Sequence, residues 1–459
     1  MSTHDSAHAS APQVGVDATD TRHLRLVIAS ALLGTTIEWY DFFLYATAAS
    51  LVFNTLFFPD TDSYVGTMLS LATFAVGFLV RPIGGIVFGH VGDRIGRKRT
   101  LAVTMLLMGL ATASMAVLPT AAQVGVLAPI LLLVLRIVQG FALGGEWAGA
   151  VLMAVEHGPR GRTGFFGSIP QIGLPLGLGL GTAVFAVLQT TLDAADFLAW
   201  GWRIAFGVSL VLVIVGFVVR LAVEETPSFR AAEAAEVTVR TPITTLLSDR
   251  TLRRPTILGL LSRWAEGAAF NTWGVFAITY ATGTLGMAKV PVLWAVTLAC
   301  AVMAAVIPLS GRMADRIPPT WIFASGVALY GVAVFPVFAL FSTADIVWFA
   351  VGLVIVFGFV HGWFYGAQGT LYALLYPTQV RYTGISFIYN VAGVYASGLT
   401  PLILTALIHA GDGSPWRAAA YLAATGAISA VATAFLRPGE PEATLRRPVE
   451  HPEPVTVGA

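Results

Sequence analysis

The sequence predicts an all-α membrane protein with twelve transmembrane helices, arranged as two six-helix bundles. Three observations lead to this fold class. Hydrophobic residues make up 56% of the 459 residues and charged residues only 11%, whereas soluble domains carry about 25% charged residues. The apolar residues gather in runs long enough to cross a bilayer, and the segments between the runs alternate between many and few basic residues.

The composition also excludes several classes of function. A net charge of +1 does not supply the basic field that nucleic-acid binding needs, so we expect no nucleic-acid partner. The single Cys300 excludes a disulfide framework or a thiolate metal site, and no motif of a membrane enzyme occurs in its proper context. We therefore expect no enzymatic activity, no metal and no cofactor.

Each predicted span is long enough to cross about 30 Å of hydrocarbon as a helix, which takes about 20 residues. A transmembrane strand would need only about 10 residues of alternating polarity, and these runs do not alternate. Residues 1–25 are polar and lack the features of a signal peptide, so we expect a disordered tail there. The spans are predicted at 26–53, 64–88, 100–118, 128–155, 163–189, 203–223, 255–281, 290–310, 320–341, 346–372, 382–409 and 417–436.

The basic residues predict the orientation of the chain in an inner (plasma) membrane. On the side opposite the termini, the only Lys or Arg residues are Arg203, Lys289 and Arg417. Apart from three arginines within spans, all others lie on the side of the termini. The positive-inside rule therefore predicts that both termini are cytoplasmic.

Two pairs of similar short segments indicate a duplicated six-span unit. The segment Gly89 to Arg94 (GHVGDR) shares its Gly and Asp-Arg spacing with Gly311 to Arg316 (GRMADR). Thr163-Gly164 and Thr383-Gly384, which each open a span, repeat at nearly the same offset. Matching offsets of two pairs favour an internal repeat.

The charge pattern divides the chain into two bundles, 26–223 and 255–437. Residues 224–254 are polar and charged, and we expect them to form a cytoplasmic linker. Residues 438–459 form a second predicted tail. Six plus six spans with a long central loop is typical of transporters in which one bundle rocks against the other around a midplane site.

Five longer motifs carry a family resemblance. They are IEWYDFFLYA (37–46), ATFAVGFLVRPIGGIVFGHVGDRIGRKR (72–99), LRIVQGFALGGEWAGA (135–150), WGWRIAF (200–206) and YPTQVRYTGISFIYNVAG (376–393). They resemble the major facilitator superfamily and, within it, the metabolite:proton symporters, the group of shikimate, 2-oxoglutarate, citrate and proline/betaine carriers. The resemblance covers residues 26 to about 437 and implies the major facilitator fold and proton-coupled transport.

Seven ionisable residues fall inside the predicted spans. A charge at mid-bilayer costs between about 2.5 and 17 kcal/mol depending on the method, so it persists mainly where it faces protein or water. We therefore expect these residues to mark the transport path. They are Glu38, Asp41, Glu146, Glu266, Arg81, Arg136 and Arg263.

Glu38 and Asp41 are the candidates for proton coupling. They are three residues apart and share one helix face. Two carboxylates in a low-dielectric medium resist double ionisation, which is the chemistry needed to carry a proton as the coupling ion. The family resemblance implies Asp41 in this role rather than Glu38. The alternative is that both are permanently paired with Arg81 or Arg136 and only hold helices together.

Arginines are the candidates for substrate binding, because the planar guanidinium binds a carboxylate in bidentate fashion. We expect Arg136 and Arg263 to anchor an organic anion. The alternative pairs Arg136 with Glu146 and Arg263 with Glu266, and both arrangements can alternate during transport. Arg81, near the cytoplasmic end of its span, is expected to reach the interface instead.

Polar and aromatic residues within spans complete the expected substrate site. Gln171 and Asn271 suit hydroxyl groups of a substrate, although hydrogen bonds between helices are the default for such residues. Tyr40 is a candidate for lining a cavity, with packing as its alternative. The full set of substrate-binding candidates is Arg136, Arg263, Glu266, Tyr40, Gln171 and Asn271.

The segment Gly89 to Arg99 is expected to form a tight cytoplasmic turn that works as a gate. Asp93 would accept hydrogen bonds from a helix amino terminus or a neighbouring arginine and so latch one state. A role of the arginines in topology alone is the alternative. The expected gating residues are Gly89, Asp93, Arg94, Gly96, Arg97, Glu146, Asp315, Arg316 and Arg381.

Together these features predict a secondary active transporter that couples proton entry to uptake of a small organic acid, shikimate-like or a dicarboxylate or oxoacid. We expect it to act in the lipid bilayer as a monomer. Uptake of a zwitterion such as proline or betaine is the alternative within this class. A receptor that does not transport is the alternative outside it.

Overall fold

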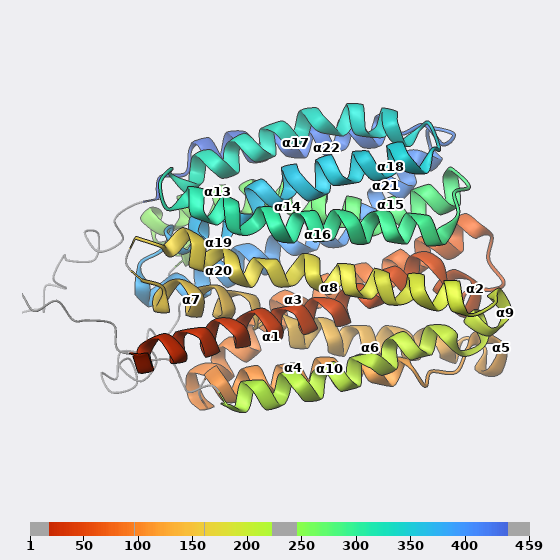
Figure 1. Cartoon of the computed structure of the whole chain (residues 1–459), viewed down its shortest axis with the longest axis horizontal. Coiled ribbons are helices and arrows are strands. Elements are labelled where there is room, and N and C mark those ends of the chain that lie inside the picture. The colour runs from red at the N-terminus through yellow and green to blue at the C-terminus, as the bar shows by residue number, and fades with distance from the viewer. Residues whose placement is uncertain (1–17, 96, 160, 223–245, 439–459) are drawn as a thin grey trace, which may run out of the picture.

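The computed structural model is a bundle of long helices that run roughly parallel and antiparallel to one another (Figure 1). It describes residues 18–95, 97–159, 161–222 and 246–438. Every regular element within these ranges is helical, which confirms the all-α prediction. Helices satisfy their own backbone hydrogen bonds, as a segment surrounded by hydrocarbon must.

The first half makes six passes through the bundle. Three short helices, α2 (Phe53–Phe57), α5 (Ala121–Val124) and α9 (Ala194–Asp196), lie between passes. The passes are α1 (Ala18–Leu51), α3 (Ser63–Ile95), α4 (Arg97–Met115), α6 (Leu127–Leu143) continued by α7 (Trp147–His157), α8 (Thr163–Thr191), and η1 (Phe197–Gly201) continued by α10 (Trp202–Ala222).

The second half makes six more passes, several of which contain wider π-helical turns, labelled η. These passes confirm the predicted six-plus-six plan. They are α13 (Arg250–Ser262) continued by α14 (Trp264–Asn271), η2 (Thr272–Phe276), α15 (Ala277–Thr279) and η3 (Tyr280–Thr284); α16 (Lys289–Ala314); α17 (Pro319–Phe341); α18 (Ile346–Leu353) with η4 (Val354–His361) and α19 (Gly362–Ala373); α20 (Thr378–Ala392) with η5 (Gly393–Gly398) and α21 (Thr400–His409); and α22 (Trp416–Ala434).

Length and composition show that 8 helices of the described chain are long and apolar enough to cross a membrane. The passes of α1, α4, α13 with α14, and α22 fall short of this measure, and those of α1 and α14 carry buried charged residues. On the outer side of α10, Val211, Ile214 and Val218 are exposed at helical spacing. An apolar outer face of this kind suits lipid rather than water.

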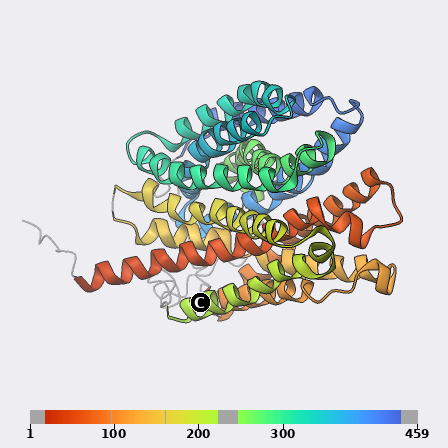
Figure 2. The same ribbon diagram turned by 45° about the vertical axis from the view of Figure 1, so that its right-hand side comes forward.

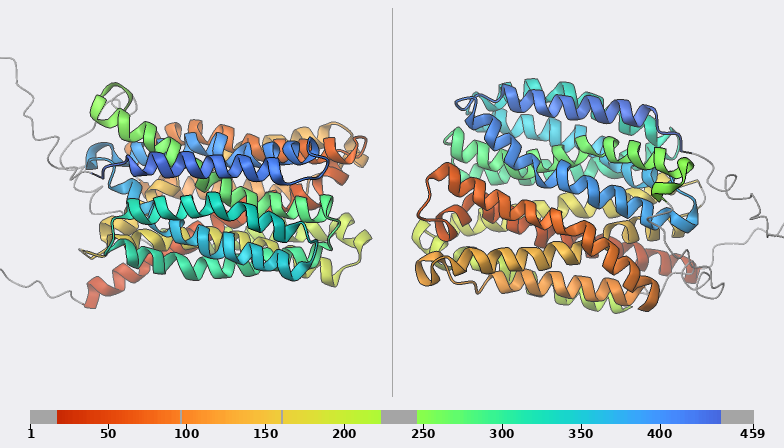
Figure 3. Two further views of the ribbon diagram at one scale, coloured as in Figure 1. Left: turned by 90° about the horizontal axis from the view of Figure 1, so that it is seen from above. Right: turned by 180° about the vertical axis from the view of Figure 1, so that it is seen from behind.

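The two halves form two bodies that meet along the length of the molecule. In Figure 1 the first half, red to yellow-green, lies below the second half, green to blue. The separation persists when the molecule is turned by 45° (Figure 2) and when it is seen from behind (Figure 3, right). The most extensive contact between elements joins α8 to α16 across this boundary.

Glycines allow the helices of the first half to approach very closely. A Cβ atom at Gly84 on α3 would lie 1.9 Å from the carbonyl oxygen of Phe141 on α6. At a second contact between the same two helices, a Cβ atom at Gly140 would lie 2.2 Å from the oxygen of Gly77. Small residues permit this backbone contact inside a membrane, where packing holds the helices together.

Two predicted boundaries are wrong. Residues 18–25 were assigned to a disordered tail but form the first turns of α1, because extending an existing helix adds a hydrogen bond per residue without a new nucleation step. The linker predicted at 224–254 is shorter, because α13 begins at Arg250. Asp249 caps this helix: the hydroxyl and backbone N–H groups of Thr251 donate to its carboxylate and hold its pKa below the ordinary value. Residues 1–17, 223–245 and 439–459 lie outside the described ranges.

The turn predicted over Gly89 to Arg99 is confined to a shorter stretch than expected. The helix α3 continues through Gly89 to Ile95, and α4 begins at Arg97, so the chain passes from one helix to the next within the predicted segment. Gly96 is outside the described residues, as are the side chains of Asp93, Arg94 and Arg97. The latch proposed for Asp93 therefore stays a prediction.

We predict that Gly84→Ala lowers the thermal stability of the purified protein by several degrees. The added methyl group meets a backbone carbonyl of α6 that cannot move alone, and overpacking of this kind costs about 1–3 kcal/mol. The matched control is Gly207→Ala on α10, where an added Cβ meets nothing within 4 Å. Thermal unfolding in detergent compares the two, and equal melting temperatures would contradict the close contact.

Candidate functional site

The seven charged residues of the predicted spans all lie inside the protein. Glu38 is the most exposed of them at 4%. Arg81 was expected to reach the interface, but it is only 2% exposed, so that expectation is wrong. Its guanidinium carbon lies 5.3–5.6 Å from the ring centroids of Trp39, Phe42, Phe78 and Tyr389. Ring faces stabilise a desolvated cation, which allows Arg81 to stay inside.

Asp41 lies in a polar network of the first half. The hydroxyl of Ser209 on α10 donates to its carboxylate, and Thr112 on α4 is also close to this carboxylate. The Nε2 group of Gln139 on α6 lies 3.1 Å from the backbone oxygen of Asp41 and 2.8 Å from the hydroxyl oxygen of Thr112. Helices α1, α4, α6 and α10 therefore converge on this residue.

Arg136 is held within the same half by groups other than carboxylates. It donates to Gln139 Oε1 and, over 3.3 Å, to the backbone oxygen of Phe74. Its guanidinium carbon lies 4.0 Å from the ring centroid of Phe42 and 4.4 Å from that of Tyr45.

The alternative that paired Arg136 with Glu146 is wrong for this conformation. Glu146 lies where α6 ends and α7 begins, and its carboxylate accepts a hydrogen bond from Thr104 on α4. Helix α6 ends at Leu143, so a break that the sequence did not predict separates Arg136 from Glu146.

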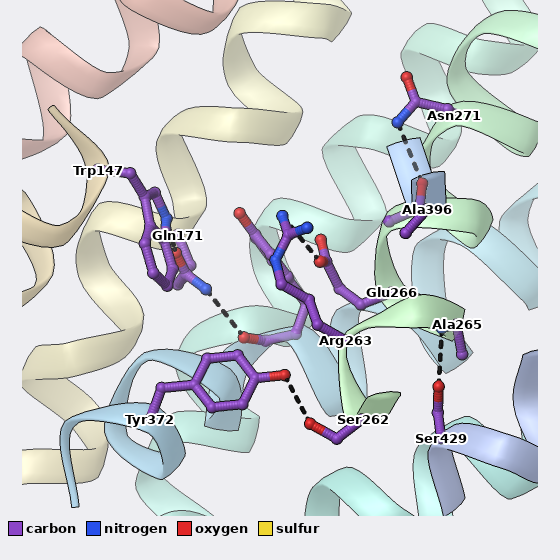
Figure 4. A network of polar contacts seen from close by, with 12 residues as sticks. Trp147, Gln171, Ser262, Arg263, Ala265, Glu266, Asn271, Tyr372, Ala396 and Ser429 are labelled. Carbon is purple, nitrogen blue, oxygen red and sulfur yellow. Dashed lines mark hydrogen bonds and ion pairs between the residues drawn. The ribbon is translucent and has the colours of Figure 1, made fainter. Parts of the chain in front are cut away.

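The pairing of Arg263 with Glu266 is confirmed. Their side chains approach to 3.2 Å where α13 meets α14, as the spacing of three residues predicts (Figure 4). The guanidinium carbon of Arg263 also lies 3.8 Å from the ring centroid of Tyr389 on α20. In the described part of the chain, Arg263 Nε and Nη1 have no hydrogen-bond partner.

Tyr389 connects this pair to the first half. The ring of Trp147 on α7 stacks on that of Tyr389, with centroids 3.8 Å apart and an interplanar angle of 11°. Trp147 Nε1 donates over 2.9 Å to Gln171 on α8, whose own amide donates over 3.3 Å to the backbone oxygen of Tyr365 on α19. Gln171 therefore makes hydrogen bonds between helices, the alternative to substrate binding. It lies beside the Arg263–Glu266 pair (Figure 4).

The other polar candidates make local contacts. The hydroxyl of Tyr40 donates over 2.9 Å to the backbone oxygen of Ala205, and Asn271 donates over 3.1 Å to that of Gly267 one turn earlier. Tyr40 thus takes its packing alternative in this conformation, whereas Asn271 bonds within its own helix and not to another helix.

Several hydrogen bonds join the halves at the end of the molecule where α10 ends and α13 begins, called here the linker end. Asp315 Oδ1 accepts from the backbone N–H groups of Gly164 at 2.7 Å and Phe165 at 3.3 Å, at the amino terminus of α8. The expected gating residue Asp315 therefore bridges the halves. Arg316 beside it is exposed, and Arg381 donates over 3.0 Å to the backbone oxygen of Tyr376.

The sequence did not assign three further bonds across the halves. Asn390 and Tyr382 of α20 donate over 2.7 Å to the backbone oxygens of Gly144 and Gly145, respectively. Thr370 donates over 3.0 Å to the backbone oxygen of Thr163. The one sequence signal for these contacts was the Gly-Gly-Glu motif, because adjacent glycines leave backbone oxygens accessible.

The halves also meet at the middle and at the opposite end. The rings of Phe43 and Phe270 lie 4.7 Å apart, and those of Tyr64 and His409 stack at 3.8 Å with an angle of 15°. The seven charged candidates are 4% exposed or less. In this conformation they are therefore shielded from solvent, and the two halves are in contact at both ends and in the middle.

Comparison with known proteins identifies the family. The family model described as Major Facilitator Superfamily matches residues 31–394 and 265–457. The chain is 38% identical to an inner membrane metabolite transport protein of Escherichia coli, covering 82% of this chain and 86% of the relative. It is 35% identical to the shikimate transporter of the same organism, with 90% and 94% covered.

A more distant relative is the proline/betaine transporter of Escherichia coli, at 31% identity with 85% and 79% covered. The fold also matches a partially occluded inward-open structure of the xylose transporter XylE from Escherichia coli, with a TM-score of 0.72. That match has 15% identity and covers 91% of this chain and 98% of XylE. The chain is accordingly a transporter and not an enzyme, and it belongs to the major facilitator superfamily and, within it, to the metabolite:proton symporter group.

Proposed function

We propose that this transporter couples proton entry to uptake of a small organic anion. The observation that carries the proposal is the position of the seven buried charges relative to the boundary between the halves, which places them in two neighbouring groups. The inner group, within the first half, is Asp41, Glu146 and Arg136. The interface group, where the halves meet, is Glu38, Glu266, Arg81 and Arg263.

The inner group supports a proton site, because it contains one more carboxylate than arginine. An uncompensated negative charge in a low-dielectric interior is costly, and binding one proton removes it. Asp41 is the preferred carrier, since the hydroxyl of Ser209 next to its carboxylate is both a donor and an acceptor. That hydroxyl can therefore bond Asp41 in either protonation state. Glu38, the other proton candidate, belongs to the interface group.

The interface group supports binding of an organic anion. Arg263 has two N–H groups without partners in the described chain and one carboxylate partner, Glu266. A substrate carboxylate can join or replace this internal partner, and the guanidinium fork favours such an exchange. The likeness to a shikimate transporter favours a hydroxylated organic acid.

A zwitterion is the second candidate substrate. The stacked rings of Trp147 and Tyr389 lie beside the pair of Arg263 and Glu266. Aromatic faces bind quaternary ammonium groups, and a relative is a proline/betaine transporter. Competition between shikimate and betaine for binding distinguishes the two.

The proposed orientation places the linker end in the cytoplasm. The basic residues favour it, and the matched metabolite transport protein is named as an inner membrane protein. Protons and substrate then enter from the opposite end. Release requires the contacts of Asp315, Tyr382 and Asn390 across the halves to break.

Uptake by proteoliposomes tests the function. Purified protein is reconstituted, and uptake of labelled shikimate and labelled 2-oxoglutarate is measured with an acidic exterior, with and without a protonophore. We expect one of the two acids to accumulate and the protonophore to abolish its accumulation. Uptake that the protonophore leaves unchanged contradicts proton coupling, and binding without uptake favours a receptor.

We predict that Asp41→Asn abolishes accumulation while retaining exchange. An imposed gradient of one pH unit drives about tenfold accumulation for a carrier that moves one proton with each singly charged anion. Without the titratable group, the internal concentration should only equal the external one. Exchange of labelled for unlabelled substrate needs no net proton movement and should persist, with a weaker dependence on pH.

The matched control for this prediction is Asp345→Asn. Asp345 is an exposed carboxylate that caps α18 outside the charged interior, so its variant should accumulate substrate as the wild type does. Accumulation by Asp41→Asn with an unchanged pH dependence would exclude Asp41 as the proton site.

We predict that Asp315→Asn weakens closure of the linker end. A charged acceptor of two backbone N–H groups contributes about 1.5–3 kcal/mol per bond, and helix α8 favours a negative charge at its amino terminus. In a Cys300→Ser background, a cysteine at Thr370 should react several-fold faster with a maleimide when Asp315 is neutral. Asp345→Asn in the same background is the control, and equal labelling rates would exclude the bridge as a closing contact.

A further inference from the structure

Two arginines from opposite halves lie beside one tyrosine at the interface. Arg81 belongs to α3 of the first half, and Arg263 lies between α13 and α14 of the second. Their guanidinium carbons are 5.6 Å and 3.8 Å from the ring centroid of Tyr389. Arg81 is 2% exposed and Arg263 is 3% exposed, so two permanent cations lie near the same ring, shielded from solvent.

Both arginines have hydrogen-bond donors that nothing in the described chain satisfies. These donors are Nε and Nη2 of Arg81, and Nε and Nη1 of Arg263. A buried donor without a partner is costly, and a charged one more so. Ring faces compensate the positive charge of a guanidinium but leave its N–H fork available. Four such donors in one place indicate that an acceptor binds there during transport.

The charges of the interface group limit what this acceptor can be. Glu266 is paired with Arg263, and Glu38 interacts electrostatically with Arg81, so two cations are balanced by two carboxylates. A ligand with one carboxylate adds one negative charge to the interface group, and the proton taken up at Asp41 removes one from the inner group, so the charge of the seven residues and the ligand together is unchanged. A ligand with two carboxylates leaves this total more negative by one charge when one proton enters with it, at a high cost in a desolvated interior.

The surroundings of Tyr389 explain how a ligand here would be enclosed. The ring of Trp147 occupies one face of Tyr389 at 3.8 Å, so the guanidinium of Arg263 lies against the other face. On the same helix as Tyr389, Tyr382 and Asn390 donate to backbone oxygens of the first half, so α20 is held against α7 beside this stack. A ligand that touches both arginines is therefore bound only while the two halves are together.

We infer that Arg81 and Arg263 jointly bind the carboxylate of a monocarboxylic acid between the two halves, with Arg81 as a specificity-determining residue. This inference rests on the proposed function and adds to it the position of the carboxylate, the second arginine and the charge of the substrate. The pairing of one arginine from each half couples anion binding to closure.

Ligand binding to the purified full-length protein tests the inference. The monocarboxylate probes are shikimate, quinate and benzoate, with 2-oxoglutarate as the dicarboxylate and the methyl ester of shikimate as a neutral analogue. Affinities follow from quenching of tryptophan fluorescence or from thermal shift. We expect a monocarboxylate to bind best. Arg81→Gln should weaken its binding about 10- to 100-fold, the loss of one charged hydrogen-bonding partner, and leave ester binding unchanged.

Two further variants separate a binding role from a structural one. Arg81→Lys retains the charge without the planar fork and should fall between the wild type and Arg81→Gln. Arg203→Gln is the matched control, since Arg203 also lies over a ring, that of Trp202 at 4.6 Å, but donates to Ala116 and Leu118 away from the interface. Its monocarboxylate affinity should equal that of the wild type.

The outcomes distinguish this inference from the proposed function. If a monocarboxylate binds the wild type and both Arg81 variants equally, the role of Arg81 is excluded while anion transport stands. Tighter binding of 2-oxoglutarate than of any monocarboxylate overturns the single-carboxylate assignment alone. If the wild type neither binds nor transports any of these acids, the proposed function fails, and the inference fails with it.

Discussion

The cost of burying charge is the constraint on which the rest of this structure depends. Seven Asp, Glu and Arg side chains of the described chain lie inside the helical bundle, and each needs a compensating neighbour because water and lipid supply none there. The protein uses three kinds of compensation. Arg263 has a carboxylate, Arg136 has an amide and aromatic rings, and Asp41 has the hydroxyl of Ser209. These contacts fix the rotation of each charged helix about its own axis.

Breaks in the helices serve the same constraint. The pass formed by α6 and α7 is interrupted at Gly144 and Gly145, where two backbone oxygens point to the other half. In a nonpolar medium such oxygens need donors, and Asn390 and Tyr382 supply them only when the halves are together. The break in this helix thereby exposes two acceptors that form hydrogen bonds between the halves when the halves meet.

The sequence could predict the features that depend on local spacing. Apolar run length gave the twelve passes, and a separation of three residues gave the pair of Arg263 and Glu266, because both properties are set within one stretch of chain. The environment of Arg81 could not be predicted in this way. It depends on rings from α1 and α20, which reach Arg81 only through tertiary packing. The partner of Asp41 is likewise 168 residues away on α10, and no local pattern indicates it.

The placement of Glu38 and Asp41 gives a physical basis for coupling. They are less than one helical turn apart on α1, yet Asp41 belongs to the inner group and Glu38 interacts with Arg81 of the interface group. Tyr40 between them ties α1 to α10 through Ala205, so this turn is not free to rotate alone. A change of charge at Asp41 therefore acts on the interface group through a short segment whose charged residues are buried. Opposite charges attract strongly over such distances in a low dielectric, so a proton bound at Asp41 favours an anion bound at Arg81 and Arg263. Helix α1 is thus the element through which one site can sense the other.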